Sequence, residues 1–372
     1  MILQVIFDHP FGNHVVEQFR DYTDVTRIVL VTYNSKNIHD VHNFPVKDII
    51  VYGTQEYKDL IAHLADYKAL IMHGLFSPIQ YDVVRKLPAS VKLAWVMWGG
   101  EIYSREDVHK LFLAPYTRFA CGLKYMKDKL IKHKKKNDEV PMDVLKRVDF
   151  LMGSSLELFE EVKTYIGSQN MKHLQYSYFT LERLIGDDLL DKTVNGRNIL
   201  LGNSATPDNN HLDIMLWLKW VGVPKFSKII TPLSYSDPWI KRMVSTVGSF
   251  LFNSRFYPLL EYMPRAEYNK LVQSCSVFIA NHHRPNAFGN TLTALWLGAR
   301  VYVSKDNVQT KFLQRLGLHV NIVERDINKY NHSLFTPLSE KEREENRRII
   351  RDIYGRNRMI ENVKTIINTL NL

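Results

Sequence analysis

Short apolar, β-branched runs alternate with amphipathic segments along this chain, and most of the runs end in a polar loop. Runs that are apolar throughout are typical of parallel strands, because helices cover both faces of such a sheet. In the first half the predicted strands span 2–7, 27–33, 48–52, 69–72, 91–97, 147–152 and 173–179. Between some of them lie helix-start signals such as Thr54 and Ser77. The pattern therefore predicts an α/β fold.

The alternation restarts after residues 180–197, which are polar and have no clear period. The predicted strands of the second half span 198–201, 228–231, 249–253, 277–280 and 301–303. The predicted helices there span 209–220, 238–247, 265–274, 290–297, 338–353 and 356–370, and we expect a loop over 256–264. A chain of 372 residues has room for two domains of ordinary size. We predict domains at 1–180 and 181–372, with C-terminal helices that could cross back.

The composition indicates in which compartment the protein works and which class of partner it binds. A formal net charge of +10 favours anionic partners. The two cysteines, Cys121 and Cys275, are too far apart in sequence for a disulfide framework or a zinc site, which fits a reducing cytoplasm. The N-terminus resembles a first strand rather than a signal peptide, and no run approaches the roughly 20 apolar residues of a membrane span. We expect a cytoplasmic protein with at most peripheral membrane contact.

A basic helix is predicted over 116–137, with Tyr125, Leu130 and Ile131 among its lysines. The lysines are Lys124, Lys127, Lys129, Lys132, Lys134, Lys135 and Lys136. One interpretation is a solvated helix face with a flexible tail. The other is a segment that lies near anionic lipid headgroups, where each lysine contributes on the order of 1 kcal/mol.

The strand at 198–201 ends at Gly202, and a loop of small polar residues leads into the next helix. A strand, a polar loop and a helix N-terminus together present backbone N–H groups to an anion. Gly202 would allow close approach, and Asn203, Ser204 and Thr206 supply hydrogen-bond donors. An ordinary capped turn has the same residue types, because capping alone selects Asn, Asp and Ser.

A second candidate anion site follows the strand at 277–280. Its loop contains His282, His283 and Arg284, and Gly289 stands at the start of the next helix. The amides of Gly289, Asn290 and Thr291 would point at an anion, and Arg284 could add charge to a phosphate. We expect no metal at the two histidines, because no third ligand stands at diagnostic spacing.

Common cofactor motifs are absent from the sequence. The chain has no dinucleotide-binding glycine fingerprint, no P-loop and no nucleophile elbow. No Asp-x-Asp dyad follows a strand, which argues against metal-dependent binding of a nucleotide sugar. We therefore expect neither a cofactor nor a metal, and no nucleic-acid partner. Since ligands of open α/β sheets bind beyond the carboxyl ends of strands, a cleft between two facing domains is the expected site.

Several stretches of the second half resemble the sugar-donor half of a GT-B glycosyltransferase. They are Pro-Leu-Leu-Glu-Tyr-Met-Pro-Arg-Ala-Glu-Tyr at 258–268, Val-Phe-Ile-Ala at 277–280 and Phe-Gly-Asn-Thr-Leu-Thr-Ala-Leu at 288–295. Leu-Gly-Asn-Ser-Ala-Thr-Pro-Asp-Asn-Asn-His at 201–211 and Trp-Gly-Gly-Glu-Ile-Tyr at 98–103 resemble, more narrowly, the bacterial TDP-N-acetylfucosamine:lipid II N-acetylfucosaminyltransferase family. The resemblance is sharp from about residue 198 to 304.

The resemblance implies two facing Rossmann-like domains, of which the first binds the acceptor and the second the sugar donor. The first quoted loop would lie beside the nucleobase, which makes Glu261 and Met263 candidate contacts. Tyr235 lies in the loop that follows a neighbouring predicted strand. Retaining enzymes of this fold often carry two glutamates eight positions apart, where this chain has Pro285 and Thr293. Their absence fits an inverting enzyme.

The implied activity transfers an amino-deoxy sugar from a TDP-sugar to a polyprenyl-diphosphate-linked saccharide, on the inner face of a bacterial inner membrane. Such a transfer needs a base for the acceptor hydroxyl proton. Glu101 is our first candidate for the base, with His73 second and His9 third, because all three follow strands of the first half. Two alternatives remain: a GT-B enzyme that uses a UDP- or GDP-sugar, and a non-catalytic binder of anionic lipid or RNA.

Overall fold

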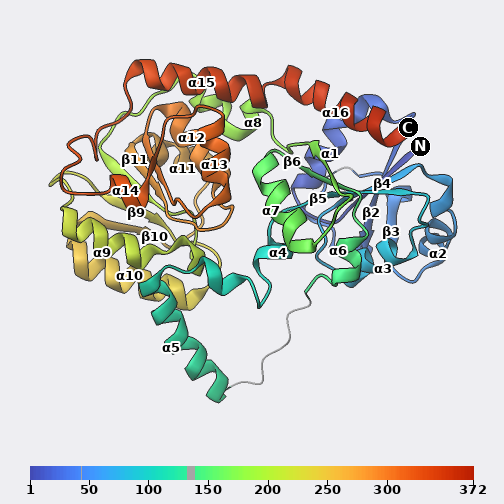
Figure 1. Cartoon of the computed structure of the whole chain (residues 1–372), viewed down its shortest axis with the longest axis horizontal. Coiled ribbons are helices and arrows are strands. Elements are labelled where there is room, and N and C mark those ends of the chain that lie inside the picture. Colours follow the sequence, from blue (N-terminus) through green and yellow to red (C-terminus); the bar gives the residue numbers. More distant parts are fainter. Residues whose placement is uncertain (43, 132–138) are drawn as a thin grey trace. The chain divides into compact units, whose positions relative to one another are not determined.

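The computed structural model describes residues 1–42, 44–131 and 139–372, and within them every strand pair is parallel (Figure 1). Contacts divide the chain into two compact units. The first unit comprises Met1–Arg105, Lys136–Thr180 and Arg356–Leu372, and the second comprises Glu106–Lys135 and Leu181–Gly355.

The first unit contains, within its described residues, a seven-stranded sheet in the order β3-β2-β1-β4-β5-β6-β7. Its strands are β1 (Ile2–Ile6), β2 (Thr26–Thr32), β3 (Ile49–Val51), β4 (Ala69–His73), β5 (Lys92–Val96), β6 (Phe150–Gly153) and β7 (Lys172–Gln175). Its helices are α1 (Phe11–Gln18), α2 (Gln55–Ala62), α3 (Pro78–Lys86), α4 (Gly100–Tyr103), α6 (Met142–Lys146), α7 (Leu156–Ile166) and α16 (Arg356–Asn371).

The second unit contains, in its described part, a six-stranded sheet in the order β10-β9-β8-β11-β12-β13. Its strands are β8 (Asn198–Leu201), β9 (Ile229–Pro232), β10 (Phe256–Leu259), β11 (Cys275–Ala280), β12 (Arg300–Val303) and β13 (Val320–Ile322). Its helices are α5 (Pro115–Ile131), α8 (Leu181–Ile185), α9 (His211–Val221), α10 (Pro238–Phe252), α11 (Arg265–Gln273), α12 (Phe288–Leu297), α13 (Val308–Arg315), α14 (Val323–Asp326) and α15 (Glu340–Tyr354).

Both sheets have the strand order of a doubly wound Rossmann-like fold. In such a sheet the chain changes direction between two central strands, and ligands bind where the loops after those strands diverge. The switch point lies between β1 and β4 in the first unit, and between β8 and β11 in the second. The loops after these four strands are therefore the first places to look for a site.

Helices cover both faces of the second sheet, as the continuously apolar strands predict. Leu200 and Phe278 lie in a core with residues of α8, α11, α12 and α15. Their neighbours Ile199 and Ile279 point to the opposite face, where α9 and α10 pack. Successive side chains of a strand alternate between faces, so each strand contributes to two cores.

The predicted strand at 249–253 is wrong. The predicted loop over 256–264 is also wrong in its first four residues, 256–259. Helix α10 continues to Phe252, and β10 follows at Phe256–Leu259. The helix buries one stripe with a spacing of four residues: Ile240, Val244, Gly248 and Phe252. The ring of Phe256 packs so closely on Gly248 that an added Cβ would lie 2.4 Å from it. The β-rich composition of this segment therefore reflects packing of the helix.

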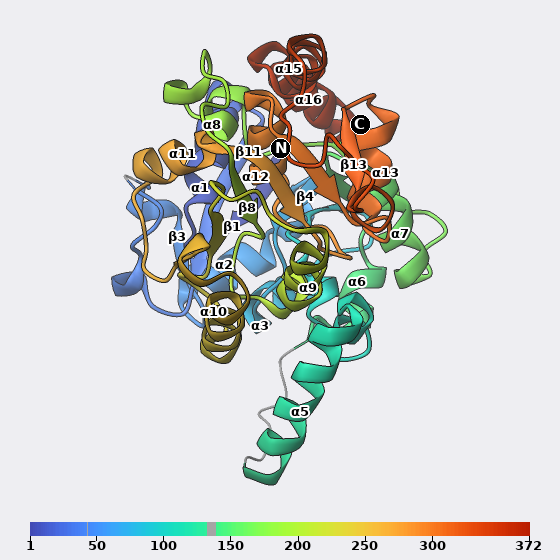
Figure 2. The ribbon, with the colours of Figure 1, turned by 90° about the vertical axis from the view of Figure 1, so that its left-hand side faces the viewer.

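The predicted first domain differs from the first unit at residues 106–131, which belong to the second unit. Leu113 and Cys121 lie in the core beneath α9, and the amides of Tyr116 and Thr117 donate to the carboxylate of Asp213 at 2.9 and 3.0 Å. Beyond this anchor α5 projects away from α9 and α10 (Figure 2). Lys132, Lys134, Lys135 and Lys136 of the basic segment lie outside the described residues.

At the C-terminus α15 packs on α12 in the second unit, and α16 packs on β1 and β7 in the first. In the described parts of the chain, no helix combines the length and apolar character that crossing a bilayer requires.

Candidate functional site

The turn after β8 requires a glycine. Gly202 has a φ of 67°, in the left-handed region, and its amide donates to the carbonyl of Ile279 at 2.9 Å. A Cβ at this position would lie 2.5 Å from both Asn209 Oδ1 and His211 Nε2. Gly202 therefore allows the chain to turn sharply while two polar side chains approach its backbone.

Asn209 holds the loop after Gly202 in one conformation. Its Oδ1 accepts from the amide of Asn203 at 2.8 Å, and its Nδ2 donates to Thr206 Oγ1 at 2.7 Å and to Ser204 Oγ at 3.2 Å. Asn203, Ser204 and Thr206, which we expected to contact a ligand, thus use much of their hydrogen-bonding capacity within the loop. Ser204 is buried, whereas Asn203 and Thr206 remain partly exposed.

His282 joins this loop to the loop after β11. Its Nε2 lies 3.1 Å from Asn203 Oδ1 and 2.9 Å from Asn209 Oδ1, so the proton of the neutral ring belongs on Nε2. Burial lowers the pKa of His282 to about 4, which keeps the ring neutral near pH 7. Its Nδ1 is buried without a hydrogen-bond partner among the described residues. The two loops at the β8–β11 switch point therefore form one network.

An ion pair adds a second link between the same two loops. Arg284 Nε lies 2.9 Å from Asp208 Oδ2, which also accepts from Asn286 Nδ2 at 3.0 Å. Burial alone would raise the pKa of Asp208, but the charge of Arg284 and the surrounding hydrogen bonds lower it. Arg284, expected to add charge to a phosphate, thus already neutralises a buried carboxylate.

The helix after this loop begins beyond Ala287, which has a φ of 55°. The amide of Thr291 donates to the carbonyl of Ala287 at 2.9 Å, so it serves the helix and is not available to a ligand. By helix geometry the amides of Phe288, Gly289 and Asn290 have no partner within α12. The side chain of Asn290 donates to the hydroxyl of Tyr268 at 3.1 Å.

Three other residues that the sequence predicts as donor contacts, Tyr235, Glu261 and Met263, lie in the loops after β9 and β10. The amide of Ala205 donates to the carbonyl of Tyr235 at 3.2 Å, so the exposed Tyr235 adjoins the first loop. Glu261 is exposed and Met263 packs against the core, both in the loop after the edge strand β10. The structure thus joins the 202–206 loop to His282 and Arg284 and leaves Glu261 and Met263 at the edge.

In the first unit His73 is fully engaged. Its Nδ1 lies 3.0 Å from the hydroxyl of Tyr178 and its Nε2 lies 3.0 Å from Gln4 Oε1. Burial lowers the pKa of His73 to about 3. His9 is half-buried, and its Nδ1 accepts from the amide of Phe11 at 3.2 Å. That bond puts the proton of neutral His9 on Nε2, the atom that a base would need unprotonated.

Glu101 lies in α4 beside the end of β5, with only 3% of its surface exposed. Its Oε1 accepts from the amides of Leu75 and Trp98 and from the indole of Trp95, at 3.2–3.3 Å. Its Oε2 shares only the amide of Trp98, at 3.2 Å. Burial raises the pKa of Glu101 to about 7, although these hydrogen bonds oppose the shift.

An aromatic group surrounds the β1–β4 switch point of the first unit. A small pocket there is lined by His9, Phe11, His73, Trp98 and Tyr178 together with nearby aliphatic residues. The rings of Phe11 and Tyr178 stack at 4.9 Å, and the indole of Trp98 donates to the hydroxyl of Tyr178 at 2.9 Å. The cavity has a volume of only about 10 Å³, far below the roughly 300–1,000 Å³ of small-molecule sites, so these side chains fill the switch point themselves.

Solved structures of low sequence identity share this architecture. The glycosyltransferase from Rickettsia africae ESF-5 has a TM-score of 0.62 and 14% identity, over 99% of this chain and 98% of that one. Anabaena Alr3699/HepE, in complex with UDP and glucose, has a TM-score of 0.61 and 12% identity, over 100% and 99%. Sucrose-phosphate synthase from Thermosynechococcus elongatus has a TM-score of 0.58 and 10% identity, over 99% and 98%. The chain has the GT-B fold.

This result confirms the fold expected from the sequence. No protein-family model matches the sequence, and a search of curated proteins finds no match. At the β8–β11 switch point, the sequence predicted the 202–206 loop, His282 and Arg284 as site residues. It did not predict Asn209 and Asp208, which connect them. Asparagine at 209 is also the residue type of an ordinary helix cap, and nothing along the chain links Asp208 to Arg284 or Asn286.

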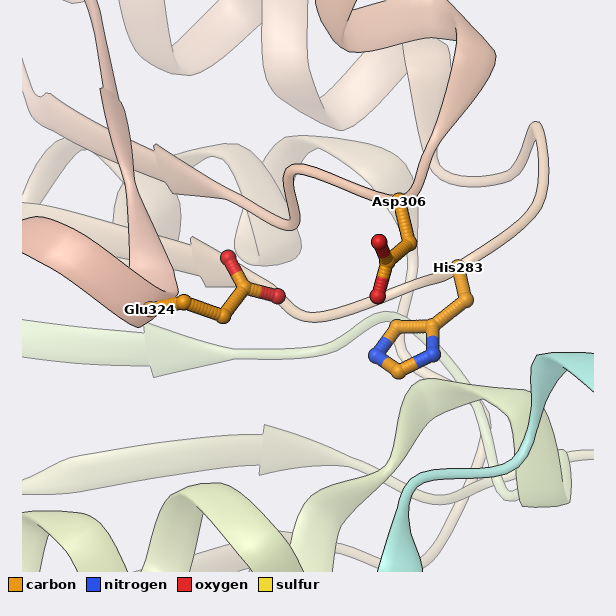
Figure 3. A group of neighbouring side chains, drawn as sticks. All are labelled: His283, Asp306 and Glu324. Carbon is orange, nitrogen blue, oxygen red and sulfur yellow. The ribbon is translucent and has the colours of Figure 1, made fainter.

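Among the described residues, one group could hold a metal ion: His283, Asp306 and Glu324 (Figure 3). His283 and Asp306 come from two different loops of the second unit, and Glu324 comes from α14.

Proposed function

We propose that the chain is a glycosyltransferase whose second unit binds a nucleotide-sugar donor. The observation that carries this proposal is the linked pair of loops at the β8–β11 switch point, which His282 joins to Asn203 and Asn209. The helix α12 begins directly after the second of these loops, its first amides have no partner within the helix, and such an N-terminus favours a diphosphate. A preformed polar network loses little entropy when a ligand binds.

The proposed reaction is an inverting, metal-independent displacement. The acceptor hydroxyl oxygen forms a bond to the anomeric carbon while the bond from that carbon to the diphosphate oxygen breaks. The hydroxyl proton passes to a base, and the nucleoside diphosphate leaves. The amides of Gly289 and Asn290, with the dipole of α12 behind them, would stabilise the negative charge on the leaving group.

We propose Glu101 as the base, ahead of His73 and His9. Both nitrogens of His73 are hydrogen-bonded in a buried site, and the neutral tautomer of His9 carries its proton on Nε2. Glu101 Oε2 shares a single amide, and a pKa of about 7 suits a base that works near neutral pH. For Glu101 to act as the base, the acceptor hydroxyl must come within hydrogen-bonding distance of this buried carboxylate at the end of β5.

Two classes of sugar donor compete within this proposal. The sequence resemblance favours a TDP-linked amino-deoxy sugar and a polyprenyl-diphosphate-linked acceptor. The solved neighbours favour another nucleotide, because HepE was solved with UDP and glucose and an Escherichia coli neighbour with UDP-2-fluoro glucose. A GT-B glycosyltransferase that uses a UDP- or GDP-sugar is therefore the second candidate.

We also propose that the enzyme acts at an anionic membrane surface, on the inner face of the bacterial inner membrane. Tyr116, Phe119 and Leu123 are 59%, 70% and 50% exposed, and their spacing of three and four residues places them on one face of α5. This apolar face precedes the lysine-rich run. Lys124 is not available to lipid phosphate, since its Nζ lies 2.6 Å from Asp237 Oδ2.

The deciding experiment is a thermal-shift titration with TDP, UDP and GDP in parallel, in buffer that contains a chelator. A nucleotide at one hundred times its Kd should stabilise the protein by about 2.7 kcal/mol. A rise with TDP alone supports the TDP-sugar, and a rise with UDP or GDP supports the second candidate. No response to any nucleotide would contradict both and favour a non-catalytic binder of anionic lipid or RNA.

The matched variants are Asn203→Ala in the network and Lys225→Ala, an exposed residue between α9 and β9. Asn203→Ala should weaken nucleotide binding while Lys225→Ala leaves it unchanged. Turnover with a panel of TDP-, UDP- and GDP-sugars then identifies the sugar.

A further inference from the structure

Two loops of the second unit and the short helix α14 converge beside the network described above. Strands β11, β12 and β13 are adjacent and parallel, so their carboxyl ends meet at one edge of the sheet. His283 lies in the loop after β11, Asp306 in the loop after β12, and Glu324 in α14 directly after β13. Residues far apart in the sequence therefore come together here (Figure 3).

The three side chains are close enough to share one ion. Each offers a ligand atom, and the three atoms lie within 4.8 Å of one another. Ligands on one tetrahedral Zn²⁺ are about 3.4 Å apart, given bonds of about 2.1 Å. The group must therefore contract by at most about 1.4 Å, toward which rotation of the exposed Asp306 side chain contributes.

Glu324 is already held in place, whereas the other two side chains are not. Glu324 Oε1 accepts from Ser304 Oγ at 2.7 Å and its Oε2 accepts from the amide of Lys305 at 3.0 Å. Within the described residues, the ring of His283 and the carboxylate of Asp306 make no hydrogen bond or ion pair. The half-buried imidazole of His283 faces two carboxylates, and the three side chains together offer a ligand set to a cation.

The charges at this place also favour a cation. The carboxylates of Asp306 and Glu324 face the ring of His283, and an imidazole ring nitrogen can donate a lone pair to a cation. Asp213 and Arg118 also act electrostatically on His283, with opposite signs. A divalent ion would compensate the two carboxylates of the group.

We propose that His283, Asp306 and Glu324 bind one divalent transition-metal ion of the Zn²⁺ class, with water completing its coordination. Imidazole with carboxylate suits Zn²⁺ better than Mg²⁺, which prefers oxygen ligands alone. The ion would tie the loop after β11 to the loop after β12, next to the bond from Asn307 Nδ2 to the carbonyl of Arg284 at 2.8 Å. Its role is to hold the loop that contains His282, and it takes no part in the transfer.

The test is isothermal titration of chelator-treated protein with ZnCl₂, with MgCl₂ in parallel. Wild type should bind one Zn²⁺, and Asp306→Asn and His283→Gln should each bind at least tenfold more weakly. The matched control is His319→Gln, which removes another histidine beside a carboxylate, 2.6 Å from Glu345, in the same unit. That variant should bind like wild type.

Three outcomes would overturn the proposal: no saturable binding by wild type, unchanged affinity in both site variants, or tighter binding of Mg²⁺ than of Zn²⁺. Asp306 is exposed, so Asp306→Asn tests the site even where His283→Gln fails to fold. The nucleotide titration is run on both the chelator-treated and the Zn²⁺-loaded protein, so failure of this proposal and failure of the proposed function are distinguishable.

Discussion

Replacement of Gly202 by alanine tests whether the turn after β8 positions the sugar-donor network. Gly167, at the C-terminal end of α7, offers a matched control. Both glycines have positive φ, 67° and 71°, but an added Cβ at Gly167 meets nothing within 4 Å. The left-handed conformation costs alanine about 1–2 kcal/mol, partly offset by about 0.4–1 kcal/mol from the stiffer unfolded chain. Gly167→Ala should therefore cost about 1 kcal/mol.

Gly202→Ala carries the same backbone cost and a steric cost as well. Its Cβ would lie 2.5 Å from Asn209 Oδ1, which accepts from the amide of Asn203 and lies 2.9 Å from His282 Nε2. Moving Asn209 breaks two or three hydrogen bonds, at about 1 kcal/mol each. Gly202→Ala should therefore cost about 2–3 kcal/mol more than the control.

Thermal unfolding and nucleotide titration of both variants check this difference. The control should bind nucleotide within twofold of wild type. Gly202→Ala should bind at least tenfold more weakly, because even 1.4 kcal/mol of lost preorganisation is a factor of ten. Equal midpoints and equal affinities in the two variants would show that contact with Asn209 is not what requires a glycine.

Three other perturbations have defined outcomes. Glu101→Gln should abolish the rise in turnover through about pH 7. Because folded Glu101 binds its proton more tightly than the unfolded chain does, the free energy of unfolding of wild type should fall by about 3 kcal/mol as the pH rises from 4.5 to 7. Unfolding of the variant, measured over the same pH range, should show no such fall. Asp208→Asn should lower the free energy of unfolding by about 3 kcal/mol, because it leaves the charge of the partly buried Arg284 beside a neutral group. Arg284→Met in the same chain should restore part of the loss in the unfolding midpoint. Phe119→Ser should weaken binding to anionic vesicles about tenfold in sedimentation, whereas Phe226→Ser, another exposed phenylalanine, should not; equal binding would contradict the role of α5.

The strands were predictable where their apolar runs were long and ended in glycine or polar residues. The run at 198–201 and the run at 69–72 match β8 and β4 within one residue. Strand β13 was missed, since it has only three residues with Asn321 at its centre. The segment at 249–253 was misassigned because its apolar residues belong to the last turn of α10, where Phe252 is buried and Phe250 is exposed.

The loops of the candidate site were predictable, but the contacts within them were not. Gly202 and the 281–291 segment stand out because they follow strands and precede helices. The pairing of Asp208 with Arg284 depends on how two strands lie side by side, which local sequence does not encode. The same reason applies to His283. The expectation of no metal rested on ligand spacing along the chain, whereas Asp306 and Glu324 lie near His283 because β11, β12 and β13 are neighbours in the sheet.

Asn210 connects the proposed membrane segment to the proposed sugar-donor network. Its left-handed conformation, with a φ of 51°, suits asparagine better than most residues. Its Oδ1 accepts from the amide of Ala114 at 2.8 Å, and its Nδ2 donates to the carbonyls of Phe112 and Asn281 at 3.0 and 2.9 Å. One buried amide thus joins the chain that enters α5 to the residue before His282. If α5 binds lipid, the ordering of its first turn acts on the same side chain that positions the loop after β11.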